Sequence, residues 1–397
     1  MSGEQERLQE LREEWDSTEP FEETLDSETV EELIELADGS GIDLVKAATQ
    51  LINDISAVDS RNFEQQIESI IKVIQNTDPE SDWSEIDDLI KTIWHVAENS
   101  PQAAAPAEDL LFEYHTHNKP YRSTAANALP YLTQESDELI DSLINRMEDK
   151  SNANRKQSAY ALMKIAEEFP DEAAPIVSMF HEMAEDTENN SDIRRHSLEG
   201  LAAYTEAHPS YEVEPDSMLS LAQDPRVEDR LRGAAVEVLA SYAKTHPEEL
   251  ADRTEEFAEL IEDDGPNVRR YSAAVFNHIA QEKPEALQPV LPQILSSCFD
   301  EYANARDRHL ETLATLVDAE VINSDDISLN QDQLISLVED DSAGTAAATL
   351  PSIKLLGIVA DTKAIETLEK YTDPQPGISN TEAKEAEEAI EQIRSRV

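Results

Sequence analysis

A short residue pattern recurs through the middle of the chain at intervals close to 38 residues. An arginine is followed by small or apolar residues at helical spacing, and in four successive copies a proline comes 15 residues after it. The arginines of these copies, Arg155, Arg194, Arg232 and Arg269, are 39, 38 and 37 residues apart. Self-similarity at such a period is typical of repeat proteins, in which each unit contacts its neighbours. The pattern therefore predicts a row of stacked repeats.

The same register extends in both directions along the chain. Arg306 follows after 37 residues, Arg122 precedes by 33, and Ile86 takes the arginine position 36 residues earlier. A single match of this kind is weak evidence, whereas seven copies in register over about 230 residues are strong evidence of a repeat.

Each copy has the pattern of two helices. After the arginine, small or apolar residues at positions +3, +6, +7, +10 and +11 form a stripe with the 3.6-residue period of a helix. The proline that follows marks a turn or the first turn of another helix. A second amphipathic stripe comes next, as in Ile176, Phe180 and Met183, and an acidic turn leads to the next arginine. Below, the arginines are called anchor arginines and the helices that bear them anchored helices.

These features resemble the HEAT-repeat family of α-solenoids. The segment 263–269, Asp-Asp-Gly-Pro-Asn-Val-Arg, with Ser272-Ala273 after it, is similar to that family's inter-helix turn and second helix. The segment 356–368 resembles the shorter HEAT-like repeats of phycobilin lyases. Tetratricopeptide repeats have a period near 34 residues and a Trp/Leu-Gly/Tyr pattern that this chain lacks. The resemblance implies an all-α fold, a right-handed α-α superhelix (armadillo-like) of about eight helix pairs.

The ends of the chain depart from the repeat pattern, and four segments are expected. They are an acidic flexible tail (1–25), an N-terminal helical cap (26–83), HEAT-like repeats of 33–39 residues (84–317), and C-terminal HEAT-like repeats with a closing helix (318–397). A helix is possible within the tail, at 4–15. Helices are expected at 28–37, 43–58 and 63–75 in the cap and at 383–393 at the end, with irregular segments at 318–330 and 373–380.

The net charge of the chain is the second constraint. There are 86 acidic and 31 basic residues, giving −55, which is strongly self-repelling in one fold. Because the Debye length falls from ~8 Å at 0.15 M salt to ~3 Å at 1 M, concentrated salt would screen this repulsion. The composition resembles that of proteins from extreme halophiles, and an acidic protein of ordinary salt is the alternative. No apolar run approaches the ~20 residues of a membrane span, and residues 1–14 lack the apolar region of a signal peptide. We expect a cytoplasmic protein without membrane insertion.

Acidic charge avoids the anchored helices. The windows 121–134, 154–168, 193–207, 231–245, 268–281 and 305–317 hold 12 basic and 7 acidic residues, a net of +5, whereas the other residues carry −60. Without the six anchor arginines the windows have a net charge of −1, so greater burial is the alternative explanation. In the HEAT family these helices usually line the concave face, which we therefore expect to bind a partner. The expected exposed contacts are Lys156, Tyr160, Arg195, His196, Glu199, Arg270, Tyr271, Ala274 and Asn277.

The resemblance gives the anchor arginines a structural role. In HEAT proteins the equivalent arginine commonly pairs with turn carboxylates and with neighbouring repeats. We expect this of Arg122, Arg155, Arg194, Arg232, Arg269 and Arg306.

No motif for catalysis, a cofactor or a metal stands out. The phosphate-binding glycine loops and the GxSxG elbow are absent. His115 and His117 have no third ligand near them in the sequence, and the His181-Glu182 pair lacks the second histidine of HExxH. Cys298, the only cysteine, lies on an apolar stripe and is expected to be buried.

The function expected from the resemblance is that of a non-enzymatic scaffold or adaptor. It would bind a protein or a peptide segment along the concave face. A nucleic-acid-associated or chromosome-associated HEAT protein is one alternative, although nucleic acid usually needs a basic footprint. An enzyme of the HEAT-like class is the other. The identity of the partner and the oligomeric state are not encoded in any pattern of this sequence.

Overall fold

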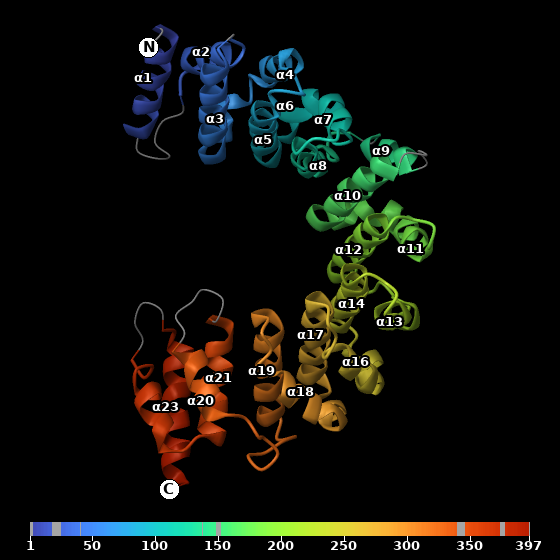
Figure 1. Ribbon diagram of the computed structural model, residues 1–397, viewed down its shortest axis with the longest axis vertical. Helices are drawn as coiled ribbons and strands as arrows, with labels where there is room; N and C mark the ends of the chain where they lie inside the picture. Colours follow the sequence, from blue (N-terminus) through green and yellow to red (C-terminus); the bar gives the residue numbers. More distant parts are fainter. Residues whose placement is uncertain are drawn as a thin grey trace. The chain divides into compact units, whose positions relative to one another are not determined.

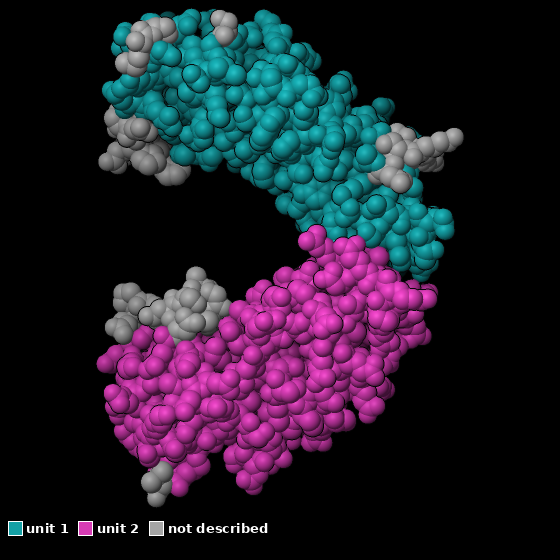
Figure 2. All heavy atoms as spheres, viewed as in Figure 1, with its two compact units in different colours: residues 1–204 teal, residues 205–397 magenta. Residues whose placement is uncertain are grey.

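The computed structural model describes residues 3–17, 25–39, 41–136, 138–147, 152–339, 346–373 and 378–396. These residues form helices joined by turns, and no β-strand occurs among them. The chain divides into two compact units, residues 1–204 and 205–397 (Figure 2). The fold is therefore all-α, as expected.

Unit 1 contains eleven α-helices and most of a twelfth, among the residues described. They are α1 (Gly3–Ser17), α2 (Ser27–Ala37), α3 (Ile42–Val58), α4 (Ile67–Asn76), α5 (Trp83–Asn99), α6 (Pro101–Ala104), α7 (Glu108–Tyr114), α8 (Tyr121–Leu132), α9 (Leu139–Met147), α10 (Asn152–Glu168), α11 (Val177–Glu185) and α12 (Ser191–Ala207). Helices α3, α5, α8 and α10 pack side by side in series, and α2, α4, α7 and α9 each cover one of them (Figure 1).

Unit 2 repeats this two-layer arrangement. Its helices are α13 (Pro215–Gln223), α14 (Asp229–Ala243), α15 (Pro247–Leu250), α16 (Thr254–Leu260), α17 (Pro266–Glu282), α18 (Leu291–Ser297), α19 (Ala303–Asp318), α20 (Gln331–Val338), α21 (Ala346–Val359), α22 (Ile365–Glu369) and α23 (Asn380–Ser395). Helices α14, α17, α19, α21 and α23 pack in series, and α13, α16, α18, α20 and α22 each cover one of them. Within each unit this is a solenoid-like stack of helix pairs.

The anchor arginines occupy the same position in successive helices. Arg155, Arg194, Arg232, Arg269 and Arg306 are each the fourth residue of their helix, as the bounds of α10, α12, α14, α17 and α19 show. Arg122 is the second residue of α8. The sequence period thus places the anchor arginine at the same helix position in five of the six helices that bear one.

The covering layer is less regular than the amphipathic stripes suggest. Pro170, Pro247 and Pro284 open short helical turns, as expected of a residue with a fixed φ and no N–H. The covering segments then break into a 3₁₀ turn and a short α-helix. Pro175 and Pro289 lie inside two of these 3₁₀ turns, where their missing N–H groups prevent a continuous helix.

The N-terminal segment differs from the expected flexible tail. Residues 3–17 form α1, which packs on α2 and α3 and contains the helix considered at 4–15. Leu8 and Leu11 are buried, and Arg7 donates to Glu32 of α2 at 2.9 Å. Two leucines three residues apart give the helix an apolar edge to pack. Residues 18–24 lie outside those described. The expected cap helices are observed as α2, α3 and α4.

The C-terminal segment follows its expected outline. Residues 319–330 form turns and irregular backbone after α19. Helix α23 contains the expected closing helix, and it begins at a capping box in which the side chains of Ser379 and Glu382 bond each other's backbone N–H. Of the second irregular segment, 373–380, residues 374–377 lie outside those described. No helix among the described residues is both long and apolar enough to cross a membrane.

Candidate partner-binding face

Two anchor arginines cross from one helix pair to the next. Arg232 of α14 pairs with Asp263, in the turn before α17, and its side chain also reaches the backbone oxygen of Ala222. Arg269 of α17 lies 2.7 Å from Asp300, in the turn before α19, and donates to the backbone oxygen of Asp263 at 2.7 Å. Each arginine side chain is about 11 % exposed. These two residues therefore join neighbouring repeats through nearly buried charge pairs.

The other anchor arginines use different partners. Arg155 donates to the side chain of Asn189 in the following turn, and Arg194 donates to the backbone oxygen of Ala184 at 2.7 Å.

Arg122 and Arg306 each form a hydrogen bond with a residue nearby in the sequence. Arg122 donates to Asn118 at 3.2 Å, and Arg306 donates to Asp307 at 3.0 Å. The shared sequence position thus does not give a shared pairing at either end of the series.

The expected contact residues of unit 1 form a network of their own. Lys156 of α10 lies 2.5 Å from Asp192, which also lies 3.5 Å from Arg195. Arg195 pairs with Glu199 at 2.6 Å, and His196 lies 3.0 Å from the same carboxylate. Burial alone would raise the pKa of Glu199, but the hydrogen bond from His196 and the charge of Arg195 lower it overall. The cations of this network are therefore neutralised within the chain.

Tyr160 ties the same network to the preceding repeat. Its hydroxyl donates to Asn127 of α8 at 3.0 Å, and its ring meets the His196 ring edge-on at 5.2 Å between centroids. Lys164 lies 5.9 Å from the centre of the Tyr160 ring. Three of the five expected contacts of unit 1, namely Lys156, Tyr160 and His196, are thus engaged between repeats.

None of the nine expected contacts is fully exposed: six are half-buried and three are buried. His196, Ala274 and Asn277 are only 5 %, 4 % and 5 % accessible, so the expectation that they are exposed is wrong. Asn277 donates to Glu311 of α19 at 3.1 Å, and anchored helices pack directly on one another there. These side chains face the neighbouring repeat because helix packing in series covers the sides of each anchored helix.

Arg270 and Tyr271 are half-buried on the face of unit 2. The Arg270 guanidinium carbon lies 4.8 Å above the centre of the Tyr271 ring, and the Tyr271 hydroxyl donates to Glu237 of α14 at 2.5 Å. The arginine is thus held over a ring that is itself fixed by a hydrogen bond.

These two residues line a pocket of about 310 Å³ within unit 2, called below the unit 2 pocket. Its lining residues are Glu206, Glu237, Ala240, Ser241, Lys244, Arg270, Tyr271, Ala274, His278 and Arg308. They come mainly from α14, α17 and α19, so the pocket lies on the anchored helices.

The charges of the unit 2 pocket are unevenly paired. Lys244 lies 2.7 Å from Glu206, and Glu237 accepts from Tyr271. Among the described residues, no carboxylate lies within 4 Å of the guanidinium of either Arg270 or Arg308. The pKa of His278 is lowered, chiefly by burial and then by the charges of Arg308 and Lys244, which favours the neutral ring. Three cations thus face two carboxylates.

Lys244, His278 and Arg308 were not among the residues expected from the sequence. Arg308 lies two positions after the anchor Arg306, as Tyr271 does after Arg269 and His196 after Arg194. Aligning the repeats on their anchor arginines would have pointed to this position. The sequence does not show which side chains at this position form ion pairs, because those pairs depend on contacts between repeats.

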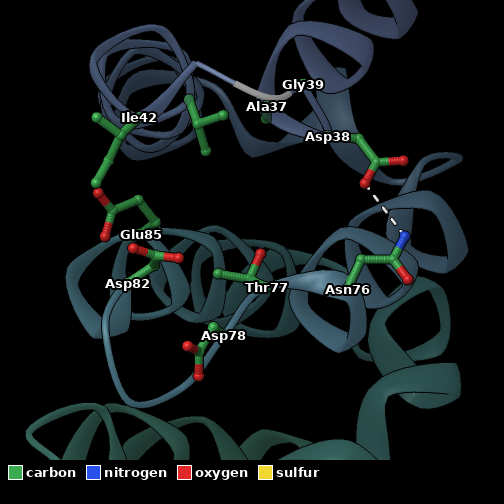
Figure 3. Close-up of a pocket in the computed structure, with 10 residues that line it drawn as sticks. Ala37, Asp38, Gly39, Ile42, Asn76, Thr77, Asp78, Asp82 and Glu85 are labelled. Carbon is green, nitrogen blue, oxygen red and sulfur yellow. Dashed lines mark hydrogen bonds between the residues drawn. The ribbon is translucent and has the colours of Figure 1, made fainter.

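A second pocket, of about 360 Å³, lies in unit 1 and has the opposite character (Figure 3). Asp38, Asp78, Asp82 and Glu85 line it, and its ten lining residues include no lysine or arginine. Asp38 accepts a hydrogen bond from Asn76 at 3.2 Å, and Ser84 donates to Glu85 at 2.7 Å. Within the described residues, no group of three or more His, Cys, Asp or Glu side chains is placed to hold a metal ion.

The remaining reactive side chains are packed. His115 is fully buried with Nδ1 2.6 Å from the backbone oxygen of Phe112, and burial lowers its pKa to about 4. His117 lies 3.0 Å from the Tyr121 hydroxyl. Cys298 is buried as expected; its thiol lies 3.2 Å from the backbone oxygen of Ile294, and burial raises its pKa.

Comparisons with known proteins give no family for this chain. No family model matches the sequence, and no curated protein matches it. Two engineered proteins solved by the Northeast Structural Genomics Consortium are structurally similar. One shares 17 % identity over 93 % of this chain and 99 % of its own, with a TM-score of 0.49. The other shares 15 % identity over 64 % and 96 %, with a TM-score of 0.38.

Proposed function

We propose that this chain is a HEAT-type solenoid scaffold that binds a protein partner, without catalysis, through the anchored helices. The observation that carries the proposal is the unit 2 pocket, which Arg270 and Arg308 line without a carboxylate of the described residues within 4 Å of either guanidinium. In a chain with 86 acidic residues, two arginines that line one pocket and form no ion pair with the residues described are an unusual surface.

The residue types on this face suit protein recognition. Arginine and tyrosine are enriched among the residues that dominate the binding energy of protein interfaces. Arg270 is stacked on Tyr271, so less freedom is lost when a partner binds to it. The network of Lys156, Arg195 and Glu199 in unit 1 is already satisfied internally, and we assign it a structural role instead of contact with the partner.

The HEAT assignment belongs to the same proposal. Supporting it are the helix pairs stacked in two layers, the arginine at the fourth position of successive anchored helices, and the bridges from Arg232 and Arg269 to the next turn. The acidic composition supports a working environment of concentrated salt, in which a partner is recognised by short-range contacts.

An affinity capture from lysate at multimolar KCl tests this function. The wild type is compared with Arg270→Glu/Arg308→Glu and with a control, Arg226→Glu/Lys283→Glu, which changes the net charge equally at exposed positions outside the pocket. We expect one or two stoichiometric proteins that the first variant loses and the control retains. Equal capture by all three chains would contradict the proposal, and so would recovery that nuclease abolishes.

A further inference from the structure

The unit 2 pocket has one positive charge in excess. Lys244, Arg270 and Arg308 supply three cations, and Glu206 and Glu237 supply two anions, so the balance is +1. The pair between Lys244 and Glu206 and the bond from Tyr271 to Glu237 occupy the two carboxylates. Among the lining residues, the unmatched charge therefore resides on the two guanidinium groups. The charge of Arg308 also acts on Glu311 of α19, which lies outside the lining and whose pKa is raised overall, chiefly by burial.

We infer that the unit 2 pocket binds a single carboxylate group, presented by an otherwise neutral or basic segment of a protein partner. This inference rests on the proposed function and specifies the chemistry of its partner. The carboxylate would accept from Arg270 and Arg308, whose planar guanidinium groups match the geometry of carboxylate oxygens.

A monovalent anion fits this balance better than a divalent one. One carboxylate brings the pocket to neutrality, whereas a phosphate with two charges would leave a net negative charge inside a chain that already carries −55. Neutral His278 adds a hydrogen-bonding group without adding charge. The surrounding acidic surface also disfavours a polyanion, which is why the rest of the segment is neutral or basic.

The size and the lining of the pocket suit a side chain or a chain terminus. A volume of about 310 Å³ lies at the lower end for ligand pockets. Ala240, Ala274 and the Tyr271 ring provide small and apolar lining beside the arginines. The stacking of Arg270 on Tyr271, and the bond from Tyr271 to Glu237, hold one guanidinium in position before any ligand binds.

The test is an NMR titration of the full chain that follows the arginine Nε–Hε signals at fixed KCl. The probes are N-acetyl-glutamate amide, which carries one carboxylate, its neutral counterpart N-acetyl-glutamine amide, and inorganic phosphate. We expect the glutamate probe to shift the Arg270 and Arg308 signals with saturation near millimolar concentration, which is about −4 kcal/mol. The glutamine probe should leave them unchanged.

Two variants make the result specific to the pocket. In Arg270→Gln/Arg308→Gln, the glutamate probe should no longer cause saturable shifts in the signals of residues around the pocket. In Arg226→Gln/Lys283→Gln these shifts should remain. Circular dichroism verifies that both variants fold. The inference is overturned by equal shifts with glutamine, by shifts that persist without the two arginines, or by phosphate binding at least tenfold more tightly than glutamate.

The NMR titration and the affinity capture distinguish failure of the carboxylate inference from failure of the proposed scaffold function. Loss of the captured partner together with loss of glutamate binding supports both proposals. A partner captured through the anchored helices, but without glutamate binding, overturns the carboxylate alone. Glutamate binding in a chain that captures no protein overturns the scaffold function and leaves an anion site.

Discussion

At the scale of single residues, neighbouring arginines in α17 have opposite roles. Arg269 is nearly buried and reaches Asp300 and the backbone of Asp263, whereas Arg270 lies over Tyr271 without an ion pair among the described residues. One position in the helix thus separates an arginine that joins repeats from one that we propose contacts a partner.

Arg269→Gln should destabilise the chain by about 3 kcal/mol, because it leaves the Asp300 carboxylate nearly buried without its partner. The matched control is Arg270→Gln, which breaks no ion pair and should change stability by about 0.5 kcal/mol or less. Urea unfolding at constant KCl, compared by midpoint, measures both. Equal midpoints for the two variants would show that the bridge between repeats contributes nothing.

His309 predicts a pH dependence of stability. It is fully buried in α19, neither ring nitrogen has a hydrogen-bond partner among the described residues, and burial lowers its pKa to about 4. An unfolded histidine has a pKa near ~6.5. Between these values only the unfolded state binds the proton, so the contribution of His309 falls by about 1.4 kcal/mol per unit as the pH decreases from about 6.5 to 4.

His309→Leu should remove this contribution. The urea midpoint of the variant should exceed that of the wild type by a margin that widens from pH 8 to pH 5. The comparison at pH 8, where both states of the wild type have neutral histidine, is the internal control. A margin that stays constant over this range would mean that His309 is not the titrating group.

At the scale of elements, the helices that pack side by side in series approach one another closely. Gly357 of α21 is an example, because a Cβ added there would lie 2.9 Å from both Cα and Cβ of Ala389 in α23. Gly357→Ala should therefore destabilise the chain by about 1–2 kcal/mol, although alanine is favoured in helices by about 1 kcal/mol. Gly3→Ala is the control, since no described atom beyond its chain neighbours and its own helix backbone lies within 4 Å of the added Cβ. Thermal unfolding measures both variants. A midpoint temperature of Gly357→Ala above that of the wild type would contradict the close contact between α21 and α23.

The elements show what the sequence can and cannot predict. The period and the stripe place the anchored helices well, since a 3.6-residue pattern and a proline at a fixed distance are local signals. The breaks in the covering layer at Pro175 and Pro289 follow from residues that could have been read in advance.

The partners of the face residues could not be predicted in the same way. Tyr160 bonds Asn127, 33 residues away, and Tyr271 bonds Glu237, 34 residues away. Such pairs depend on how adjacent helices are offset, which no periodic pattern specifies. For the same reason the sequence could not show that Arg195 is neutralised while Arg308 is not.

At the scale of the whole molecule, the charge of −55 predicts a requirement for salt. Repulsion among carboxylates grows as the Debye length lengthens, so the helical stack should loosen below about 0.5 M KCl. Dialysis to low salt, followed by circular dichroism at 222 nm, should show a fall in helicity that is restored when KCl is returned. Unchanged helicity would show that the fold tolerates its own charge.

The most direct test of the central claim is to find which layer of unit 2 a partner contacts. A photo-crosslinking amino acid is placed either at Ser241, which lines the unit 2 pocket, or at Ser296, which is exposed on the covering helix α18. Each chain is incubated with lysate at multimolar KCl and irradiated. The account predicts a discrete protein adduct from position 241 that is absent from position 296. Adducts from position 296 alone, or equally from both, would contradict it.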